Sequence, residues 1–183
     1  TFTLTNSGNA IGSVASSNQV NVVSVRDDGG FTVGALNAAT SLTLQSDGTV
    51  NQSGVITTPL LTLTASTGGL GDFTLNTQNN VLTNVTSTNT LNSVALRDDG
   101  GFVLGALAAD TSVTLQTDGT VTQTGALTGG AAVTLTATTP GNGTFTLTNS
   151  GNAIGSVASS NLVDVVSVRD DGGFTVGALN AAT

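Results

Sequence analysis

Large apolar residues alternate with small polar residues in short runs along this chain. Leu42 and Leu44 flank one threonine, Leu61 and Leu63 flank another, and the arrangement recurs through the sequence. A period of two is expected of a β-strand that buries one face. The runs that carry phenylalanine are expected to be rows of the core, and they contain Phe2, Leu4, Phe73, Leu75, Phe145 and Leu147.

Glycine-containing turns separate these runs, for example at 28–30, 47–48, 68–69 and 118–119. Glycine adopts positive φ at little steric cost, and aspartate bonds readily to nearby backbone amides, so both residues favour turns. No window of the chain sustains apolar residues at the spacing of an amphipathic helix. The pattern therefore predicts an all-β chain of short strands joined by polar turns, with almost no α-helix.

The sequence Arg-Asp-Asp-Gly-Gly-Phe occurs three times, at 26–31, 97–102 and 169–174. The spacing between copies is nearly constant, and such regularity is typical of a repeat protein. Large apolar positions stay apolar when the copies are compared, while the positions between them vary. The positions that this comparison places inside are Val23, Val94 and Val166, then Val25, Leu96 and Val168, and after the motif Phe31, Phe102 and Phe174, with Val33, Leu104 and Val176.

The similarity extends well beyond the motif. Residues 1–40 recur as 144–183, and only Gln19 and Asn21 are replaced, by Leu162 and Asp164. We interpret 1–183 as one continuous segment of a longer repeat array, with units at approximately 1–71, 72–143 and a truncated 144–183. Two units make the larger period, after which the sequence of residue 1 onward returns at residue 144.

Three other β architectures fit the repeat less well. Separate β-sandwiches of about 70 residues would each have a marginal core. An outer-membrane barrel needs aromatic girdles, whereas this chain has six phenylalanines and no other aromatic residue. A propeller blade has a period of roughly 40 to 50 residues.

A parallel β-helix, or β-solenoid, fits the pattern better, because successive coils share one thin core. The apolar pairs that begin at Val23, Leu42 and Leu61 are evenly spaced and suggest about 20 residues per coil. Each unit then holds three to four coils, and equivalent motifs lie some three coils apart. Nine coils would form a rod on the order of 43 Å long. The crossover preference of parallel strands predicts a right-handed coil.

Composition narrows the classes of function. Eleven acidic residues, all aspartate, oppose three arginines and give a net charge of −8. Such a surface repels nucleic acid and anionic lipid, so neither is an expected partner. The chain contains no cysteine, and a mean hydropathy of +0.25 with 8% charged residues argues against disorder. No run approaches the roughly 20 apolar residues of a membrane helix, so membrane insertion is not expected.

Three stretches, 2–12, 20–34 and 42–48, together resemble the repeats of filamentous-haemagglutinin-type exoproteins. The resemblance covers essentially the whole chain. It implies a right-handed parallel β-helix exported by a bacterial two-partner or autotransporter system, located outside the cell or on its surface. The usual role implied is adhesion or fibre formation. Expected partners are neighbouring repeats of the same chain, end-to-end copies, or a host cell or matrix.

The paired aspartates are the main candidates for chemistry. Asp27-Asp28, Asp98-Asp99 and Asp170-Asp171 could ligate Ca²⁺ or act in glycoside hydrolysis. We favour a turn in which each arginine pairs with a neighbouring aspartate. The side chains that usually share catalytic work, His, Glu, Lys, Tyr and Cys, are absent from the sequence. We therefore expect no catalytic, cofactor-binding or metal-binding residue and no cofactor.

Threonine pairs suggest another candidate, because Thr-x-Thr ladders resemble those of ice-binding solenoids. The pairs are Thr3 and Thr5, Thr62 and Thr64, Thr134 and Thr136, and Thr146 and Thr148. Equivalent outer positions are occupied by Ser24, Ala95 and Gln45, so the ladder is incomplete, and threonine is in any case a common residue of exposed strand faces.

The resulting expectation is a non-enzymatic extracellular fibre or stalk. A host-binding or glycan-binding adhesin segment is the alternative, and a polysaccharide-cleaving enzyme or an ice-binding array is less favoured. A shaft of this kind should resist heat and proteases, including trypsin at Arg26, Arg97 and Arg169.

Overall fold

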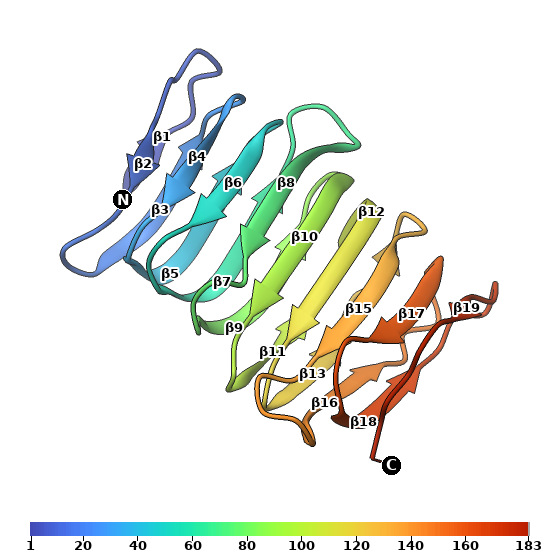
Figure 1. Ribbon diagram of the computed structural model, residues 1–183. Helices are drawn as coiled ribbons and strands as arrows, with labels where there is room; N and C mark the ends of the chain where they lie inside the picture. Colours follow the sequence, from blue (N-terminus) through green and yellow to red (C-terminus); the bar gives the residue numbers. More distant parts are fainter. Residues whose placement is uncertain (183) are drawn as a thin grey trace.

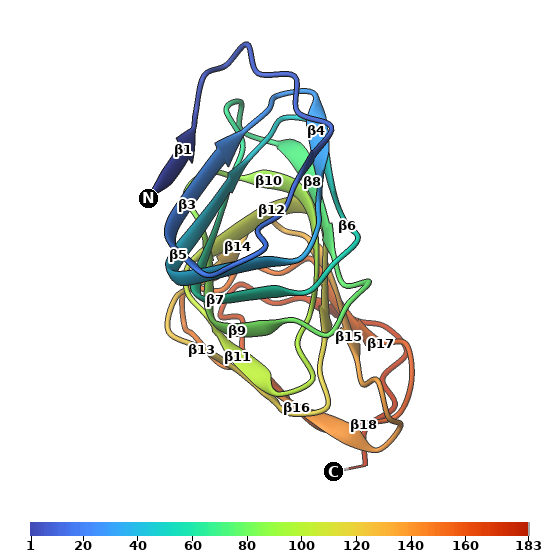
Figure 2. The same ribbon diagram turned by 90° about the vertical axis from the view of Figure 1, so that its left-hand side faces the viewer.

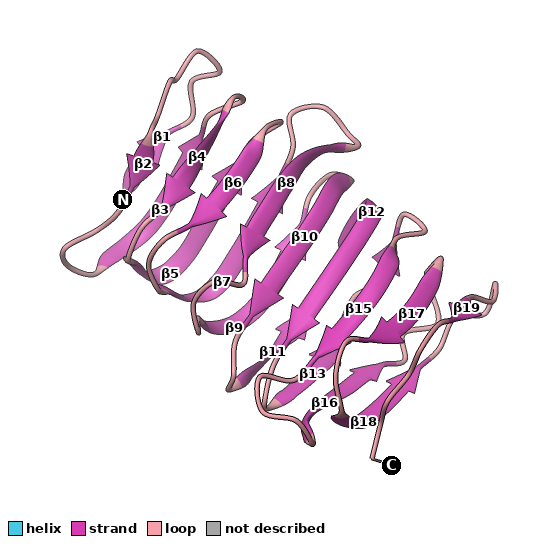
Figure 3. Cartoon of the chain, viewed as in Figure 1, coloured by secondary structure: helices cyan, strands magenta, loops and turns pink. Residues whose placement is uncertain are grey.

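The chain folds as a rod of stacked coils. A computed structural model describes residues 1–182, and every regular element among them is a strand. The strands form two parallel sheets that face each other across one interior, and the termini lie at opposite ends of the rod (Figures 1 and 3). Figure 2 shows the coils stacked around that interior. No helix in the described residues could cross a membrane.

The first sheet, sheet A, contains nine strands in sequence order along the rod. Their bounds are β1 Phe2–Leu4, β3 Val20–Arg26, β5 Leu36–Gln45, β7 Ile56–Thr64, β9 Val81–Ser87, β11 Gly101–Leu104, β13 Thr120–Gln123, β16 Asn142–Leu147 and β18 Val163–Val168. Every step between neighbours is parallel, for example from β3 to β5 and from β5 to β7.

The second sheet, sheet B, has the same parallel arrangement. Its bounds are β2 Ser13–Val14, β4 Gly30–Val33, β6 Thr49–Gln52, β8 Leu70–Leu75, β10 Leu91–Arg97, β12 Leu107–Gln116, β15 Ala132–Thr136, β17 Ser156–Ser159 and β19 Thr175–Val176, while β14 Leu127–Thr128 pairs with the start of β12. The chain makes about nine turns of about 20 residues each, so the predicted β-solenoid is confirmed.

The apolar positions of successive strands stack on one another inside the rod. Val23 lies beside Leu42 and Leu42 beside Leu61, so the interval between these apolar pairs is one coil, as predicted. Val23, Val25, Phe31 and Val33 are all at most 4% exposed. A single cluster of Val, Leu, Ile, Phe and Ala side chains runs the length of the rod, and its burial is the main stabilising contribution.

Three inward assignments are wrong for the end coils. Phe2 is 45% exposed, Leu4 40% and Val176 57%, although the equivalent Phe73 and Phe145 are at most 1% exposed. The physical reason is that β1 and β19 each have a neighbouring strand on one side only. These side chains occupy the predicted face, but no coil covers them.

Equivalent strands of consecutive units lie in opposite sheets. Val23 belongs to β3 in sheet A, Val94 to β10 in sheet B and Val166 to β18 in sheet A. Seven steps along sheet A lead from β1 to β16, whose Phe145 is the equivalent of Phe2 two units later. One unit is therefore three and a half coils, or about 17 Å along the rod. We call this arrangement the half-turn repeat.

Candidate functional site: the corner clamps

The Arg-Asp-Asp-Gly-Gly motif forms the corner where one sheet passes into the other. The first copy joins β3 to β4 and the second joins β10 to β11. Because of the half-turn repeat, the first copy passes from sheet A to sheet B and the second passes from B to A. The corners of consecutive units consequently lie on opposite edges of the rod, about three and a half coils apart, which agrees with the three to four coils per unit expected from the sequence.

The second aspartate of each motif binds the arginine, as predicted. Arg26 donates from Nε and Nη2 to the two carboxylate oxygens of Asp28, at 2.9 and 2.7 Å. Arg97 makes the same bidentate pair with Asp99 at 3.0 and 2.7 Å, and Arg169 pairs in the same way with Asp171. Such planar pairs fix the arginine in one direction.

The first aspartate is buried in the first two motifs and binds backbone amides. Asp98 is 4% exposed, and its Oδ1 accepts the Gly100 N–H at 2.8 Å, while its Oδ2 accepts the Leu82 N–H at 2.5 Å. Asp27 is equally buried and accepts the equivalent N–H groups of Gly29 and Ile11. The carboxylate therefore joins its own turn to the preceding coil.

A buried asparagine adds a third set of bonds at each corner, and the sequence-based expectations did not include it. We call the arginine–aspartate pair, the backbone bonds of the first aspartate and this asparagine together the corner clamp. Asn80 is 1% exposed, and its Nδ2 donates to the carbonyl oxygens of Leu75 and Arg97 at 2.9 and 3.0 Å. Its Oδ1 accepts the Ile56 N–H at 2.9 Å and a bond from Gln52. One amide thus joins backbone groups of three successive coils.

Asn152 repeats the arrangement in the next unit. It donates to Leu147 and Arg169 and accepts from the Leu127 N–H and from Gln123. Asn9 occupies the same place in the first unit and donates to the Arg26 carbonyl. An asparagine precedes every motif arginine at the same offset, and that constant offset was the signal available in the sequence.

Polar groups of the following coils surround the half-buried carboxylates of Asp28, Asp47 and Asp99. Asp47 accepts the backbone N–H groups of Ser66 and Thr67, and the Ser66 hydroxyl donates to Asp28 at 3.0 Å. On the opposite edge the equivalent donor to Asp99 is the Thr138 hydroxyl, at 2.8 Å. Residues 1–182 contain no group of three or more acidic, histidine or cysteine side chains placed to hold a metal ion. The aspartates act as acceptors that hold consecutive corners together.

The two neighbouring aspartates of the second corner should titrate on opposite sides of their ordinary pKa of 3.8. Burial raises the pKa of Asp98, while the hydrogen bond from Arg97 lowers the pKa of Asp99. Asp98 then stabilises the fold at low pH and loses that contribution as pH rises through its raised pKa. Asp99 stabilises the fold above its ordinary pKa and loses that contribution as pH falls.

Carboxyl-carbon NMR titration of the folded chain checks this split. Replacing Arg97 with glutamine should bring the pKa of Asp99 upward and leave that of Asp98 above 3.8. Coincident titration of both groups in the native chain would contradict the assignment.

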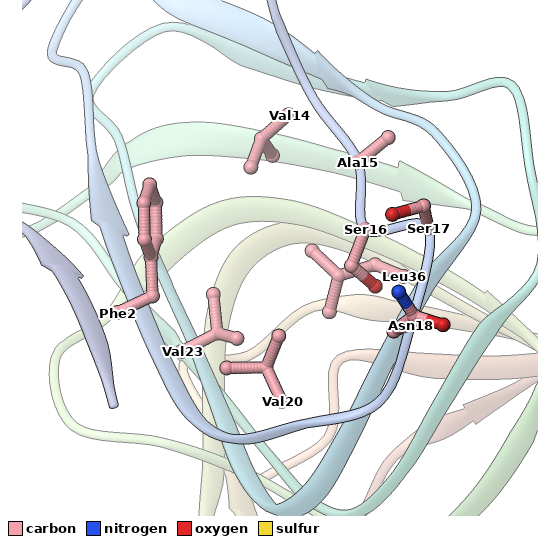
Figure 4. A pocket seen from close by; sticks show the side chains of 9 residues that line it. All are labelled: Phe2, Val14, Ala15, Ser16, Ser17, Asn18, Val20, Val23 and Leu36. Atoms are coloured by element: carbon pink, nitrogen blue, oxygen red, sulfur yellow. The ribbon is translucent and has the colours of Figure 1, made fainter.

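A cavity of about 260 Å³ lies at the open edge of the first coil (Figure 4). Phe2, Val14, Val20, Val23 and Leu36 form its apolar walls, and Ser16, Ser17 and Asn18 form its rim. Its lining includes no titratable side chain. The cavity is the interior of the rod where β1 and β2 have no preceding coil.

The outward faces carry columns of small polar side chains. In sheet A, Thr3, Ser24, Thr43 and Thr62 lie beside one another on consecutive strands. In sheet B the column reads Thr32, Asn51, Thr74, Ala95, Thr114, Thr134 and Ala158. Threonine is thus interrupted by serine in the first column and by asparagine and alanine in the second.

Comparison with known proteins gives one family match. Residues 20–89 and 91–161 each match the family described as "Repeats of unknown function (DUF5649)". Each matched segment covers almost one complete repeat unit. No curated protein matches the chain, and no solved structure does.

Proposed function

We propose that this chain, which belongs to the DUF5649 repeat family, is a structural shaft that works as an extracellular fibre or stalk and not as an enzyme. The main support is the corner clamp, which recurs once in every unit and joins neighbouring coils with equivalent bonds at Asn80 and Asn152. In such a quasi-one-dimensional array, stability is the sum of coil and interface contributions, so length can increase without a new core.

The ionisable groups of the corners support the same proposal. Arg26 and Arg97 bind aspartates of their own turns, and the buried Asp27 and Asp98 bind backbone. These groups hold the coil in shape. Placement outside a bacterial cell, through two-partner or autotransporter secretion, rests on the resemblance to filamentous-haemagglutinin repeats and is part of the proposal.

Ligand binding along the outer columns is the second candidate, because they present hydroxyl and amide groups at a regular interval of about 4.8 Å. It predicts saturable binding of a glycan or host surface by residues 1–183 alone. Replacing Thr74 and Thr114 with lysine should remove that binding without unfolding the rod.

Limited trypsin digestion tests the shaft directly. The Arg26 and Arg97 side chains are 23% and 22% exposed and fixed in bidentate pairs, whereas Arg169 is 53% exposed near the C-terminal end of the rod. We expect cleavage after Arg169 first, with Arg26 and Arg97 resistant until the rod melts. Mass spectrometry of the fragments identifies each cut.

The matched control is Asp99→Asn, which should accelerate cleavage after Arg97 and leave cleavage after Arg26 unchanged. Rapid cleavage after both Arg26 and Arg97 in the unaltered, folded chain would be incompatible with a rigid shaft.

A further inference from the structure

The first two corner clamps are each followed, on the next two coils, by a glutamine and then by a hydroxyl-bearing side chain. On the first edge, the Ser66 hydroxyl donates to Asp28 at 3.0 Å and accepts the Nε2–H of Gln45 at 2.9 Å. Gln45 belongs to the coil between the other two. One hydroxyl is thus held between a carboxylate and a primary amide.

The second unit repeats this arrangement on the opposite edge. The Thr138 hydroxyl donates to Asp99 at 2.8 Å and accepts the Nε2–H of Gln116 at 3.1 Å. Threonine takes the place of serine here, so the hydroxyl is retained although the residue type differs. Both sets lie on coils that have neighbours on both sides, so the arrangement belongs to the interior of the array.

These three groups are the parts needed for acyl transfer. The hydroxyl oxygen can act as the nucleophile, the carboxylate can accept its proton, and the glutamine Cδ is the electrophilic carbon. Arg26 is the register partner of Gln45, and Arg97 is that of Gln116. Each arginine therefore carries its positive charge beside an amide whose carbonyl oxygen becomes negative during attack.

We propose that Ser66 and Thr138 form ester bonds with Gln45 and Gln116, and that each bond joins one coil covalently to the next. At the first site the Ser66 oxygen bonds to Cδ of Gln45 and the Cδ–Nε2 bond breaks. The hydroxyl proton passes through Asp28 to the departing nitrogen, which leaves as ammonia. No atom is oxidised or reduced, and no co-reactant is needed. The cross-link goes beyond the shaft function and requires only the stacked coils.

The geometry of the corner indicates a slow reaction in which each site reacts once. The amide nitrogen of glutamine faces the hydroxyl, so the soft terminal torsion of the side chain must first turn the face of the amide toward the oxygen. The hydrogen bond from Arg26 lowers the pKa of Asp28, which keeps the carboxylate ionised and makes it a weak base. The fixed position of the hydroxyl favours it over water as the nucleophile.

Intact mass spectrometry of the purified chain, kept folded at neutral pH, tests the proposal. The native chain should become lighter than its sequence by two molecules of ammonia. Ser66→Ala and Thr138→Ala should each lose only one, whereas Thr138→Ser keeps the hydroxyl and should lose both. Alkaline hydrolysis of the denatured native chain should open both esters and leave a carboxylate in place of each amide.

Two glutamine variants provide the matched comparison. Gln45→Glu removes the amide at the first site and should lose one ammonia. Gln19→Glu should still lose two, because Gln19 is exposed and its amide bonds to Asn37 and not to a hydroxyl. A native chain that keeps its full mass after prolonged incubation would overturn the proposal. Ammonia loss that persists in the Ser66→Ala/Thr138→Ala double variant would do the same, since it would come from another amide.

Thermal unfolding followed by circular dichroism separates failure of the cross-link from failure of the shaft. The double variant should keep the β-sheet spectrum of the native chain and melt at a lower temperature, because two covalent bonds between coils are missing. If the rod folds but keeps every amide, the ester is wrong and the shaft stands. If the double variant does not fold, the masses of Thr138→Ser and Gln45→Glu still decide the question.

Discussion

Replacing Asn80 with alanine is expected to lower the free energy of unfolding by about 4 kcal/mol, because it leaves buried polar groups without partners. The Ile56 N–H and the Leu75 carbonyl oxygen lose the bonds that they make to the Asn80 side chain, whereas the Arg97 carbonyl keeps the backbone N–H of residue 80, at 3.3 Å. Each buried polar group that loses its hydrogen bond costs about 1 to 3 kcal/mol. Two such groups, on neighbouring coils, lose their bonds together.

Denaturant unfolding measures the total loss, and amide hydrogen exchange locates it. The Ile56 amide should lose protection in the variant, because its acceptor is gone. Asn84→Ala is the matched control, since Asn84 lies on the exposed face of β9 and its removal should change stability by less than about 0.5 kcal/mol. Similar stabilities for the two variants would show that the amide clamp contributes little.

Replacing Gly101 with alanine is expected to cost about 3 kcal/mol through backbone strain and overpacking. Gly101 has φ +91°, which L side chains rarely adopt, and an added Cβ would lie within 3.0 Å of the backbone O, N and C atoms of Thr120. The neighbouring coil cannot move away without breaking the parallel pairing of Gly101 with Thr120. Strain and overpacking each contribute about 1 to 3 kcal/mol.

Gly68→Ala is the control for this prediction, because no atom lies within 4 Å of a Cβ built at that position. It should leave the thermal midpoint unchanged or raise it slightly, since alanine restricts the unfolded chain. The two variants are compared by calorimetry. A Gly101→Ala chain as stable as Gly68→Ala would mean that the coils are packed less closely at the corner than described.

The interior of the rod could be predicted from sequence because the alternation of apolar and polar residues is visible within each short strand. Val23, Val25, Phe31 and Val33 were assigned inside from the comparison of copies, and all four are buried. The bidentate partner of Arg26 was predictable for the same reason, since Asp28 lies almost next to it in the chain. Contacts between residues so close in the chain can be predicted without knowing which coil stacks on which.

The half-turn repeat was hidden because both sheets use the same inward and outward pattern. Val23 and Val94 look equivalent whether they occupy one sheet or two, and only the number of coils per unit distinguishes these cases. Asn80 was overlooked for a related reason: its partners Ile56 and Arg97 are distant in the sequence and lie on different coils. Phe2 lies on the face predicted for it. Its exposure depends on whether a second strand covers β1, and the pattern within the strand does not reveal this.

One unit advances three and a half coils. Whether an array contains an odd or an even number of units therefore decides which side of the rod its last strands face. An array that gains or loses a single unit still stacks equivalent strands on one another at the junction, yet turns whatever lies beyond the change to the opposite side. A change of two units preserves the orientation. The length of the rod and the direction in which its edges face are therefore coupled, and only changes by pairs of units alter the length alone.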